Sequence, residues 1–271
     1  MKRIDARLHP ILAGRAVRLR DSDARVDPAI ADEKELKNAT KRLVKRLAKL
    51  QRVLWADRRY ALLVVLQGRD ASGKDGTIRG VFGKVNPQGC MVAGFKVPTD
   101  LEASHDYLWR AHHVVSPRGM IGIFNRSHYE DILIPRVRKL LPKSVWSARH
   151  DQINGFEQML AANGVVILKF MLHISDAEQK RRFEDRLHDK TKNWKFRAGD
   201  LEDRKLWPEF ADAYREILRR TSTARAPWYI VPADEKGVRN YFIARTVTER
   251  LEQLRLRYPP PDPAIEGLTI A

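Results

Sequence analysis

The sequence predicts an α/β fold in which a parallel five-stranded sheet is covered by helices on both faces. Short apolar runs alternate along the chain with longer segments of helical period, as they do in strand–helix units of a parallel sheet. The run Ala61–Gln67, ALLVVLQ, is continuously apolar, as a strand buried on both faces requires. It leads directly into a glycine-rich turn, GRDASGKDGT at residues 68–77, and this order of strand, turn and helix is typical of a phosphate-binding loop.

The chain begins with an arm, residues 1–29, that has no sustained hydrophobic period and contains Pro10, Gly14 and Pro28. We expect the arm to be irregular and to lie on the domain or on a partner subunit. From about Ile30, apolar residues recur at steps of three and four, which predicts an amphipathic helix. Its other faces carry Lys34, Lys37, Lys41, Lys45 and Lys49. We favour a solvated face on a packing helix, with a nucleic-acid-binding helix as the alternative.

The remaining strands and helices follow in alternation after the glycine-rich turn. Further strands are expected at Met91–Phe95, Met120–Asn125, Gly164–Ile174 and Trp228–Val231. Helices are expected near 99–112, 144–163, 176–189, 208–220 and 237–257. Ser175 and Glu178 form a capping-box pattern at the start of one of these helices. The prolines that follow Tyr258 end the domain, so that residues 30–258 form one domain and residues 259–271 a tail.

The composition narrows the choice of partner and compartment. The chain has 271 residues and a formal net charge of +17, with an isoelectric point near 10.1, so a polyanion is an expected partner. Nucleic acid, an anionic membrane surface and inorganic polyphosphate all satisfy that charge. The single cysteine, Cys90, excludes an internal disulfide and fits a reducing compartment. No apolar run has the length of a signal sequence or a membrane span, so we expect a cytoplasmic protein.

The glycine-rich turn fits the first seven positions of the pattern G-x-x-x-x-G-K-[ST]. Its glycines allow backbone N–H groups to surround phosphate oxygens, the following helix presents its positive end, and Lys74 reaches the transferred phosphoryl group. The loop is expected to comprise Gly68, Arg69, Asp70, Ala71, Ser72, Gly73, Lys74, Asp75, Gly76 and Thr77.

The position of the usual metal-binding Ser or Thr is taken by Asp75. The metal must therefore be held differently, and Asp70 is the best candidate because hard cations prefer carboxylate oxygen. Asp75 or Thr77 could assist. Asp is also common in turns, which is the alternative for Asp70.

Polar residues follow the predicted strand Met120–Asn125, in the sequence NRSHYED. Ligands of open α/β sheets bind outside the carboxyl ends of the strands, so these residues face the same crevice as the loop. Asn125, Arg126 and Glu130 are the candidate nucleotide-binding residues, and Arg126 can clamp an acceptor phosphate. Alternatively, Arg126 pairs with Glu130 or Asp131.

A basic segment between Lys180 and Lys205 contains ten Lys or Arg in 26 residues. Such a segment suits a lid, at about residues 176–206, which closes over phosphates and stabilises charge on the transferred group. The alternative for any single arginine is a solvated helix face with neighbouring acids.

These motifs together resemble the polyphosphate kinase 2 family over residues 30–258. The resemblance rests on VLQGRDASGKDGTIRGVF, VNPQGCMVAGFKVPT, IGIFNRSHYEDILIPRV, ILKFMLHISDAEQKRRFEDRL, NWKFRAGDLEDR and TSTARAPWYIVPAD. It implies a three-layer α/β/α P-loop kinase with a helical lid, similar to thymidylate kinase. It also implies phosphoryl transfer between inorganic polyphosphate and nucleotides with Mg²⁺ or Mn²⁺, and a homo-dimer or homo-tetramer.

The resemblance assigns roles to individual residues. Asp70 and Lys74 serve the Walker loop, with Asp70 acting through the metal, and Arg126 grips phosphate; these three are the catalytic candidates. The polyphosphate path is lined by Lys74 and by the lid residues Arg181, Arg182, Arg186, Lys192, Lys195 and Arg197.

Asn125 bears on the choice of acceptor. Many relatives that handle only diphosphates carry Asp there, whereas FNRSHYED looks like the subgroup that phosphorylates both AMP and ADP. An amide in place of a carboxylate relieves repulsion with nucleotide phosphates. The expected partners are therefore polyphosphate, AMP, ADP and ATP, without nucleic acid or membrane. An ATP-dependent nucleotide or small-molecule kinase is the nearest alternative, and a nucleic-acid-binding protein is a more distant one.

Overall fold

The computed structural model describes residues 6–27 and 32–270, and it confirms the predicted α/β fold. All five strands are parallel, in the order β2-β3-β1-β4-β5. Their bounds are β1 Ala61–Gln67, β2 Cys90–Gly94, β3 Ile121–Asn125, β4 Val165–His173 and β5 Trp228–Pro232. Every residue of β1 and β4 is buried, as expected for central strands between two helical layers.

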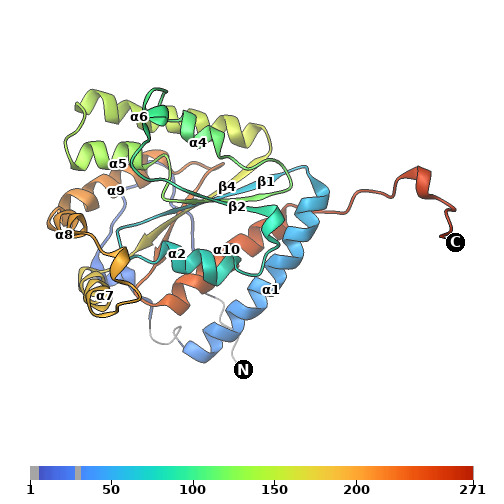
Figure 1. Ribbon diagram of the computed structural model, residues 1–271, viewed down its shortest axis with the longest axis horizontal. Helices are drawn as coiled ribbons and strands as arrows, with labels where there is room; N and C mark the ends of the chain where they lie inside the picture. The colour runs from blue at the N-terminus through green and yellow to red at the C-terminus, as the bar shows by residue number, and fades with distance from the viewer. Residues whose placement is uncertain (1–5, 28–31, 271) are drawn as a thin grey trace.

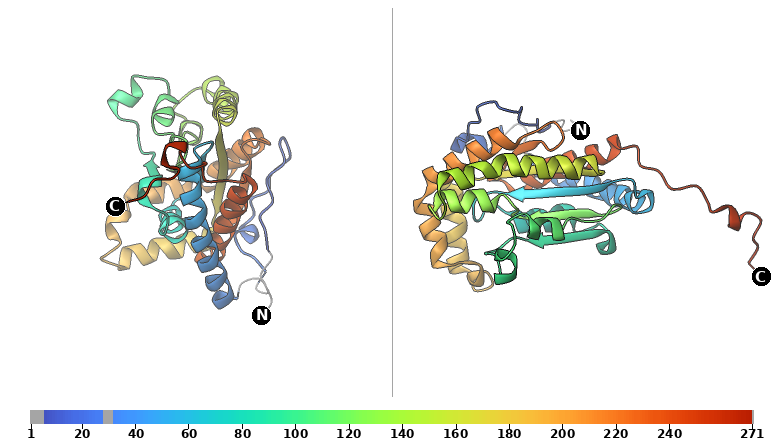
Figure 2. Two further views of the ribbon diagram at one scale, coloured as in Figure 1. Left: turned by 90° about the vertical axis from the view of Figure 1, so that its right-hand side faces the viewer. Right: turned by 90° about the horizontal axis from the view of Figure 1, so that it is seen from above.

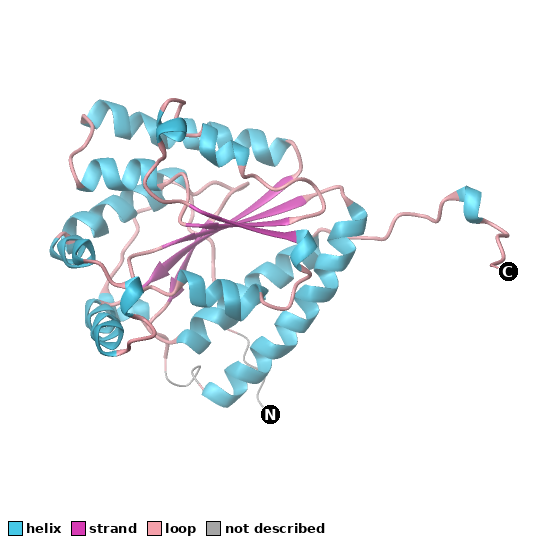
Figure 3. Cartoon of the chain, in the orientation of Figure 1, coloured by secondary structure: helices cyan, strands magenta, loops and turns pink. Residues whose placement is uncertain are grey.

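Helices cover both faces of the sheet and make three layers (Figures 1 and 3). One face packs on α1 (Glu33–Asp57), α10 (Lys236–Gln253) and the helix that follows the glycine-rich turn, α2 (Lys74–Thr77) with its π-helical continuation Ile78–Phe82. The other face packs on α5 (Glu130–Val137), α6 (Lys143–Ala162) and α9 (Trp207–Thr221). Alternate residues of each strand enter the two cores, so that Leu62 lies in one and Leu63 in the other.

The helix expected near 99–112 is wrong: the chain forms two short helices there, α3 (Asp100–Ala103) and α4 (Trp109–His113). Ser104 ends the first because its hydroxyl donates to the backbone of that helix. The carboxylate of Asp106 then accepts a backbone N–H at the start of the second. These local hydrogen bonds compete with a continuous helix.

The described part of the arm runs along the domain beside β5. The backbone N–H of Ile11 donates to Trp228 O at 2.8 Å, and Ala24 O accepts from the N–H of Asp234. Residues 6–27 therefore contact their own domain. The tail after residue 258 extends away from the body of the protein (Figures 1 and 2).

Two further helices, α7 (Asp176–His188) and α8 (Ala198–Lys205), follow β4 at the carboxyl edge of the sheet. They lie together at one end of the molecule, opposite the end from which the tail extends (Figure 2). The hydroxyl of Ser175 caps α7 by accepting from the backbone N–H of Glu178, as predicted. The second half of the capping box does not form, because the Glu178 carboxylate pairs with Arg181 and Arg182 and the N–H of Ser175 donates to Asp234. Among the described residues, no helix has the length and apolar character that crossing a membrane requires.

Candidate active site

The glycine-rich turn wraps tightly between β1 and α2. Gly73 has φ +100°, a conformation that favours glycine, and a Cβ built there would lie 1.9 Å from an Arg239 guanidinium nitrogen. Arg239, on α10, donates to Ser72 O at 3.4 Å and so holds the turn from beneath. Burial lowers the pKa of Arg239 to about 10, which leaves it cationic at neutral pH.

Lys74, the first residue of α2, is buried under the turn. Its Nζ donates to Gly68 O at 2.7 Å and to Arg69 O at 3.2 Å, so the ammonium points into the loop. Burial, with the nearby charge of Arg126, lowers the pKa of Lys74 to about 8, while Asp70 acts in the opposite direction. The side chain is thus fixed where an anion bound in the loop would meet it.

Arg126 brings the end of β3 to the loop, as predicted. Its guanidinium donates to Asp70 Oδ1 at 2.7 Å and lies 3.9 Å from Glu130. Of the two alternative partners, Glu130 does lie near Arg126, but the contact of Arg126 with Asp70 is shorter. Asp131, the other alternative, pairs with Arg110. Burial opposes ionisation of Asp70, but Lys74 and Arg126 outweigh it and hold the pKa of Asp70 below its usual range.

Asp75 joins three elements of the site. Its Oδ1 accepts from the Asn125 amide at 2.8 Å, and its Oδ2 lies 3.6 Å from Lys195 Nζ. Burial opposes ionisation of Asp75, yet the Asn125 hydrogen bond and the Lys195 charge keep its pKa below the ordinary value. The loop, the end of β3 and the segment between α7 and α8 meet at this one carboxylate.

The basic residues of the predicted lid divide into two groups. Arg186 and Lys195 face the site: Arg186 lies 3.8 Å from Asp200, which lines the cavity beside the loop, and Lys195 pairs with Asp75. Arg197 is exposed, and Lys192 is exposed and pairs with Asp189. Neither contacts the loop.

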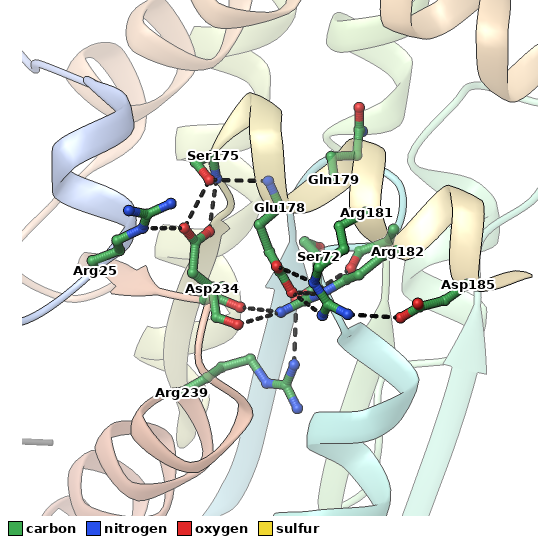
Figure 4. A network of polar contacts seen from close by, with 12 residues as sticks. Arg25, Ser72, Ser175, Glu178, Gln179, Arg181, Arg182, Asp185, Asp234 and Arg239 are labelled. Atoms are coloured by element: carbon green, nitrogen blue, oxygen red, sulfur yellow. Dashed lines mark hydrogen bonds and ion pairs between the residues drawn. The ribbon is translucent and has the colours of Figure 1, made fainter. Parts of the chain in front are cut away.

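Arg182 differs from its neighbour Arg181 in what it contacts (Figure 4). The Arg182 side chain is buried and donates to Ala71 O at 2.8 Å, and also to Ala233 O and Asp234 O. Both arginines pair with Glu178, but Arg181 makes its other contact with the exposed Asp185, on the solvent side. In this arrangement the guanidinium of Arg182 binds the backbone of the glycine-rich turn and the loop after β5, so its direct contribution is to position the turn.

A cavity of about 40 Å³ lies between the turn and the α7–α8 segment. Arg69 closes one side, where its guanidinium stacks 3.6 Å above the Trp207 ring and donates to Trp207 O. Asp200 and Asp203 of α8 line the same cavity. Small-molecule sites are typically about 300–1,000 Å³, so the cavity in this arrangement is smaller than a nucleotide needs.

Comparison with known proteins agrees with this geometry. The sequence model of the polyphosphate kinase 2 family matches residues 30–258. The chain belongs to the polyphosphate kinase 2 family.

Relatives and solved structures extend the match. The chain is 51% identical over 228 residues to the AMP/ADP-polyphosphate phosphotransferase of Meiothermus ruber, with 84% of this chain and 85% of the relative covered. It is 42% identical to the ADP-polyphosphate phosphotransferase of Rhodopseudomonas palustris, over 93% of this chain and 91% of the relative. The crystal structure of polyphosphate kinase 2 from Arthrobacter aurescens TC1 superposes with a TM-score of 0.86 at 37% identity, covering 93% of this chain and 90% of that one.

Several contacts in this polyphosphate kinase 2 fold were not predicted from the sequence. Arg239 is separated from the loop by more than 160 residues and gave no local signal. Gln179, which donates to Asp70 O at 3.0 Å, was not predicted either. Trp207, whose ring stacks on Arg69, was not predicted as a site residue. Asp200 and Asp203, which line the cavity, were likewise not predicted as site residues.

A buried polar network supports the turn that carries Arg126. Lys169, in the centre of β4, places its Nζ 2.5 Å from Glu157 Oε2 of α6. The same ammonium donates to Tyr129 OH at 2.8 Å and to Thr221 O at 2.7 Å. Tyr129 lies three residues after Arg126 and donates to the other Glu157 oxygen. Burial opposes ionisation of Glu157, but the Lys169 ammonium outweighs it and holds the pKa of Glu157 below its usual value.

The site fits a hard divalent cation through Asp70. Within the described residues no three acidic, His or Cys side chains converge as a complete metal cluster. Mg²⁺ does not need one, since it is commonly held by one or two carboxylates together with substrate phosphates and water. The hydroxyls of Ser72 and Thr77 are buried in the loop without a hydrogen-bond partner, which suits polar ligand atoms that the loop has yet to bind.

Proposed function

We propose that this protein transfers phosphoryl groups between inorganic polyphosphate and the nucleotides AMP and ADP. The observation that carries the proposal is the convergence of Lys74, Asp70 and Arg126 at one turn under a cationic lid, residues 176–206. Relatives that cover more than four-fifths of the chain are named as polyphosphate phosphotransferases acting on AMP and ADP or on ADP.

In the proposed reaction, the end of the polyphosphate chain binds at the glycine-rich turn. Lys74 and Arg126 hold the transferred group and offset the charge that spreads over its oxygens. The attacking atom is an oxygen of the nucleotide's terminal phosphate, which is anionic at neutral pH and needs no general base. The bond from the transferred phosphorus to the polyphosphate oxygen breaks, and the shortened chain leaves with that oxygen.

Mg²⁺ or Mn²⁺ would be held by Asp70, and it would supply charge neutralisation between the two phosphate chains. Asp70 would then share or exchange its contact with Arg126, which would leave Arg126 free to grip phosphate.

Asn125 supports the use of both AMP and ADP. Its amide donates to Asp75, which leaves its carbonyl oxygen and second N–H for the acceptor. A carboxylate at this position would stand 2.8 Å from another carboxylate and repel the acceptor phosphates.

The lid opens to admit the nucleotide and closes over the phosphates. Within the lid, α7 is anchored to the loop through Gln179 and Arg182. The part that follows α7 meets the loop at the Lys195–Asp75 pair, which spans 3.6 Å, is half-exposed and is worth about 1 kcal/mol or less. Opening of this outer part is therefore inexpensive, and bound phosphates supply new partners for Arg186 and Lys195 on closing.

The test is to incubate the protein with AMP or ADP, Mg²⁺ and polyphosphate in the absence of ATP. We expect ADP and ATP to form, and we expect the Lys74→Ala variant to form neither while keeping its circular dichroism spectrum. An ATP-dependent kinase would give no product until ATP is added. Turnover by Lys74→Ala at the wild-type rate would refute the role assigned to the loop.

A further inference from the structure

One face of α1 carries a row of cationic side chains that the proposed reaction does not use. We call it the α1 stripe: Lys34, Lys37, Lys41, Lys45, Lys49 and Arg52. Steps of three and four keep all six on one side of the helix, opposite the buried leucines. All are exposed, and the stripe runs for about 27 Å at the helical rise of about 1.5 Å per residue.

The cations of the α1 stripe are unpaired, unlike many others on the surface. The ion pairs among residues 6–27 and 32–270 include none of the six, although Arg46 on the adjoining face pairs with Glu252. In the lid, by contrast, Arg181, Lys192 and Lys205 all pair with neighbouring acids. A row of unpaired cations repels itself and is stabilised by a bound polyanion.

The stripe leads into a groove of about 360 Å³ between the end of α1 and the segment before β2. Lys49 and Arg52 line it from the helix, and Lys84 lines it from the opposite side, with no acidic residue among the lining groups. Gln51 fixes the walls together, because its side-chain oxygen accepts from the backbone N–H of Asn86 at 3.2 Å. The three cations therefore converge on a formed groove.

Among the described residues that line the groove, Trp55 is the one aromatic side chain; it is 39% exposed, and the Arg58 guanidinium lies 5.9 Å from its ring centroid. Proteins that bind single-stranded nucleic acid stack successive bases on several aromatic side chains. The groove instead combines three cations with a single aromatic ring, which favours a chain of phosphates that carries no bases.

We propose that the α1 stripe and its groove form a second binding track for inorganic polyphosphate, separate from the phosphoryl-transfer site. Figure 1 places the end of α1 on the side of the molecule away from α7 and α8. The helical segment from Lys74 to Phe82 runs from the glycine-rich turn toward Lys84. A long chain that touches both sites is held at a high effective concentration, whereas a short one is not. The choice of polyphosphate rests on the proposed function; the binding itself does not require catalysis.

The experiment compares two variants that each lose three positive charges. The groove variant is Lys49→Gln/Arg52→Gln/Lys84→Gln. The control variant is Lys143→Gln/Arg219→Gln/Arg225→Gln, at exposed positions on or beside α6 and α9, which cover the other face of the sheet. Binding of end-labelled long-chain polyphosphate and of tripolyphosphate is measured by fluorescence anisotropy and calorimetry, without nucleotide, at several salt concentrations.

We expect the groove variant to bind long-chain polyphosphate about fivefold more weakly than wild type, with tripolyphosphate binding unchanged. The slope of log Kd against log salt should fall by about two, at about 0.7 per lost phosphate contact. The control variant should stay within about twofold of wild type, because its charges act only at long range.

Two results would overturn the inference. Equal weakening in both variants would assign the effect to net charge alone. The second such result is that a single-stranded oligonucleotide binds more tightly than polyphosphate of equal charge, and that this binding is lost in the groove variant. The track would then be a nucleic-acid site. Failure of the proposed function looks different: wild type would form no nucleotide product from polyphosphate, while groove-dependent binding would persist.

Discussion

Replacing Lys169 with methionine tests how much the buried polar network around Lys169 and Glu157 contributes to the stability of the protein. Lys169 and Glu157 are both almost fully buried, and their charged atoms lie 2.5 Å apart. Removing one partner of a buried ion pair costs about 3–5 kcal/mol, because the other charge stays behind. With a change in melting temperature of about 2–4 °C per kcal/mol for chains of this size, Lys169→Met should melt about 10 °C lower.

The pH dependence of that loss follows from the carboxylate left behind. In the wild type, the Lys169 ammonium holds the Glu157 pKa below its unfolded value, so the pair contributes stability above that value and loses it as pH falls through the folded pKa. In Lys169→Met, the largest charge that opposes burial is gone, so the Glu157 pKa rises, although the contacts of Glu157 with His128 and Tyr129 remain. The folded state then binds the proton more tightly, so the variant loses less stability at pH 5 than at pH 8.

The measurement is urea unfolding of wild type, Lys169→Met and the double variant Glu157→Gln/Lys169→Met, followed by circular dichroism at both pH values. The double variant removes the stranded charge and should recover much of the loss at pH 8. A Lys169→Met variant within about 1 kcal/mol of wild type at pH 8 would show that Lys169 does not compensate the buried Glu157 charge, since that loss is far below the cost of an unpaired buried charge.

Three predictions concern the site itself. The catalytic efficiency kcat/KM for polyphosphate should fall above about pH 8, because free Lys74 loses its proton there; a profile flat to pH 10 would contradict this. Asn125→Asp should lower the efficiency with AMP about tenfold by placing a carboxylate against Asp75, and adding Asp75→Asn should restore part of it; an unchanged AMP rate would exclude the repulsion. Arg182→Ala should cost about 2–4 kcal/mol of stability and most of the activity, whereas the matched Arg181→Ala should cost under about 0.5 kcal/mol; equal effects in thermal melts would show that burial does not distinguish them.

The fold and the loop could be predicted from the sequence because their signals are local. A continuous apolar run such as Ala61–Gln67 indicates a buried strand, and the spacing of Gly68, Gly73 and Lys74 fixes the turn that follows. The position of Arg126 near that turn could also be predicted, because both follow strands of one parallel sheet and the carboxyl ends of parallel strands lie at the same edge.

Side-chain direction and distant partners could not be predicted in the same way. Arg181 and Arg182 are adjacent and of one type, yet the helix turns one toward solvent and the other toward the backbone of Ala71. Arg239 meets Gly73 only because α10 packs beside α2 in the folded chain. Lys169 did leave a signal, a charged residue inside the apolar run of β4, but its partners lie on other elements.

The phosphoryl donor of the proposed reaction is inorganic polyphosphate. Phosphorus-31 NMR of the protein with AMP, Mg²⁺ and polyphosphate, in the absence of ATP, follows donor and acceptor in one sample. We predict that the internal-phosphate signal of polyphosphate declines in step with the appearance of the ADP and ATP phosphates, one phosphate lost for each gained. Nucleotide signals that stay unchanged until ATP is supplied, or polyphosphate lost as free phosphate alone, would contradict the account.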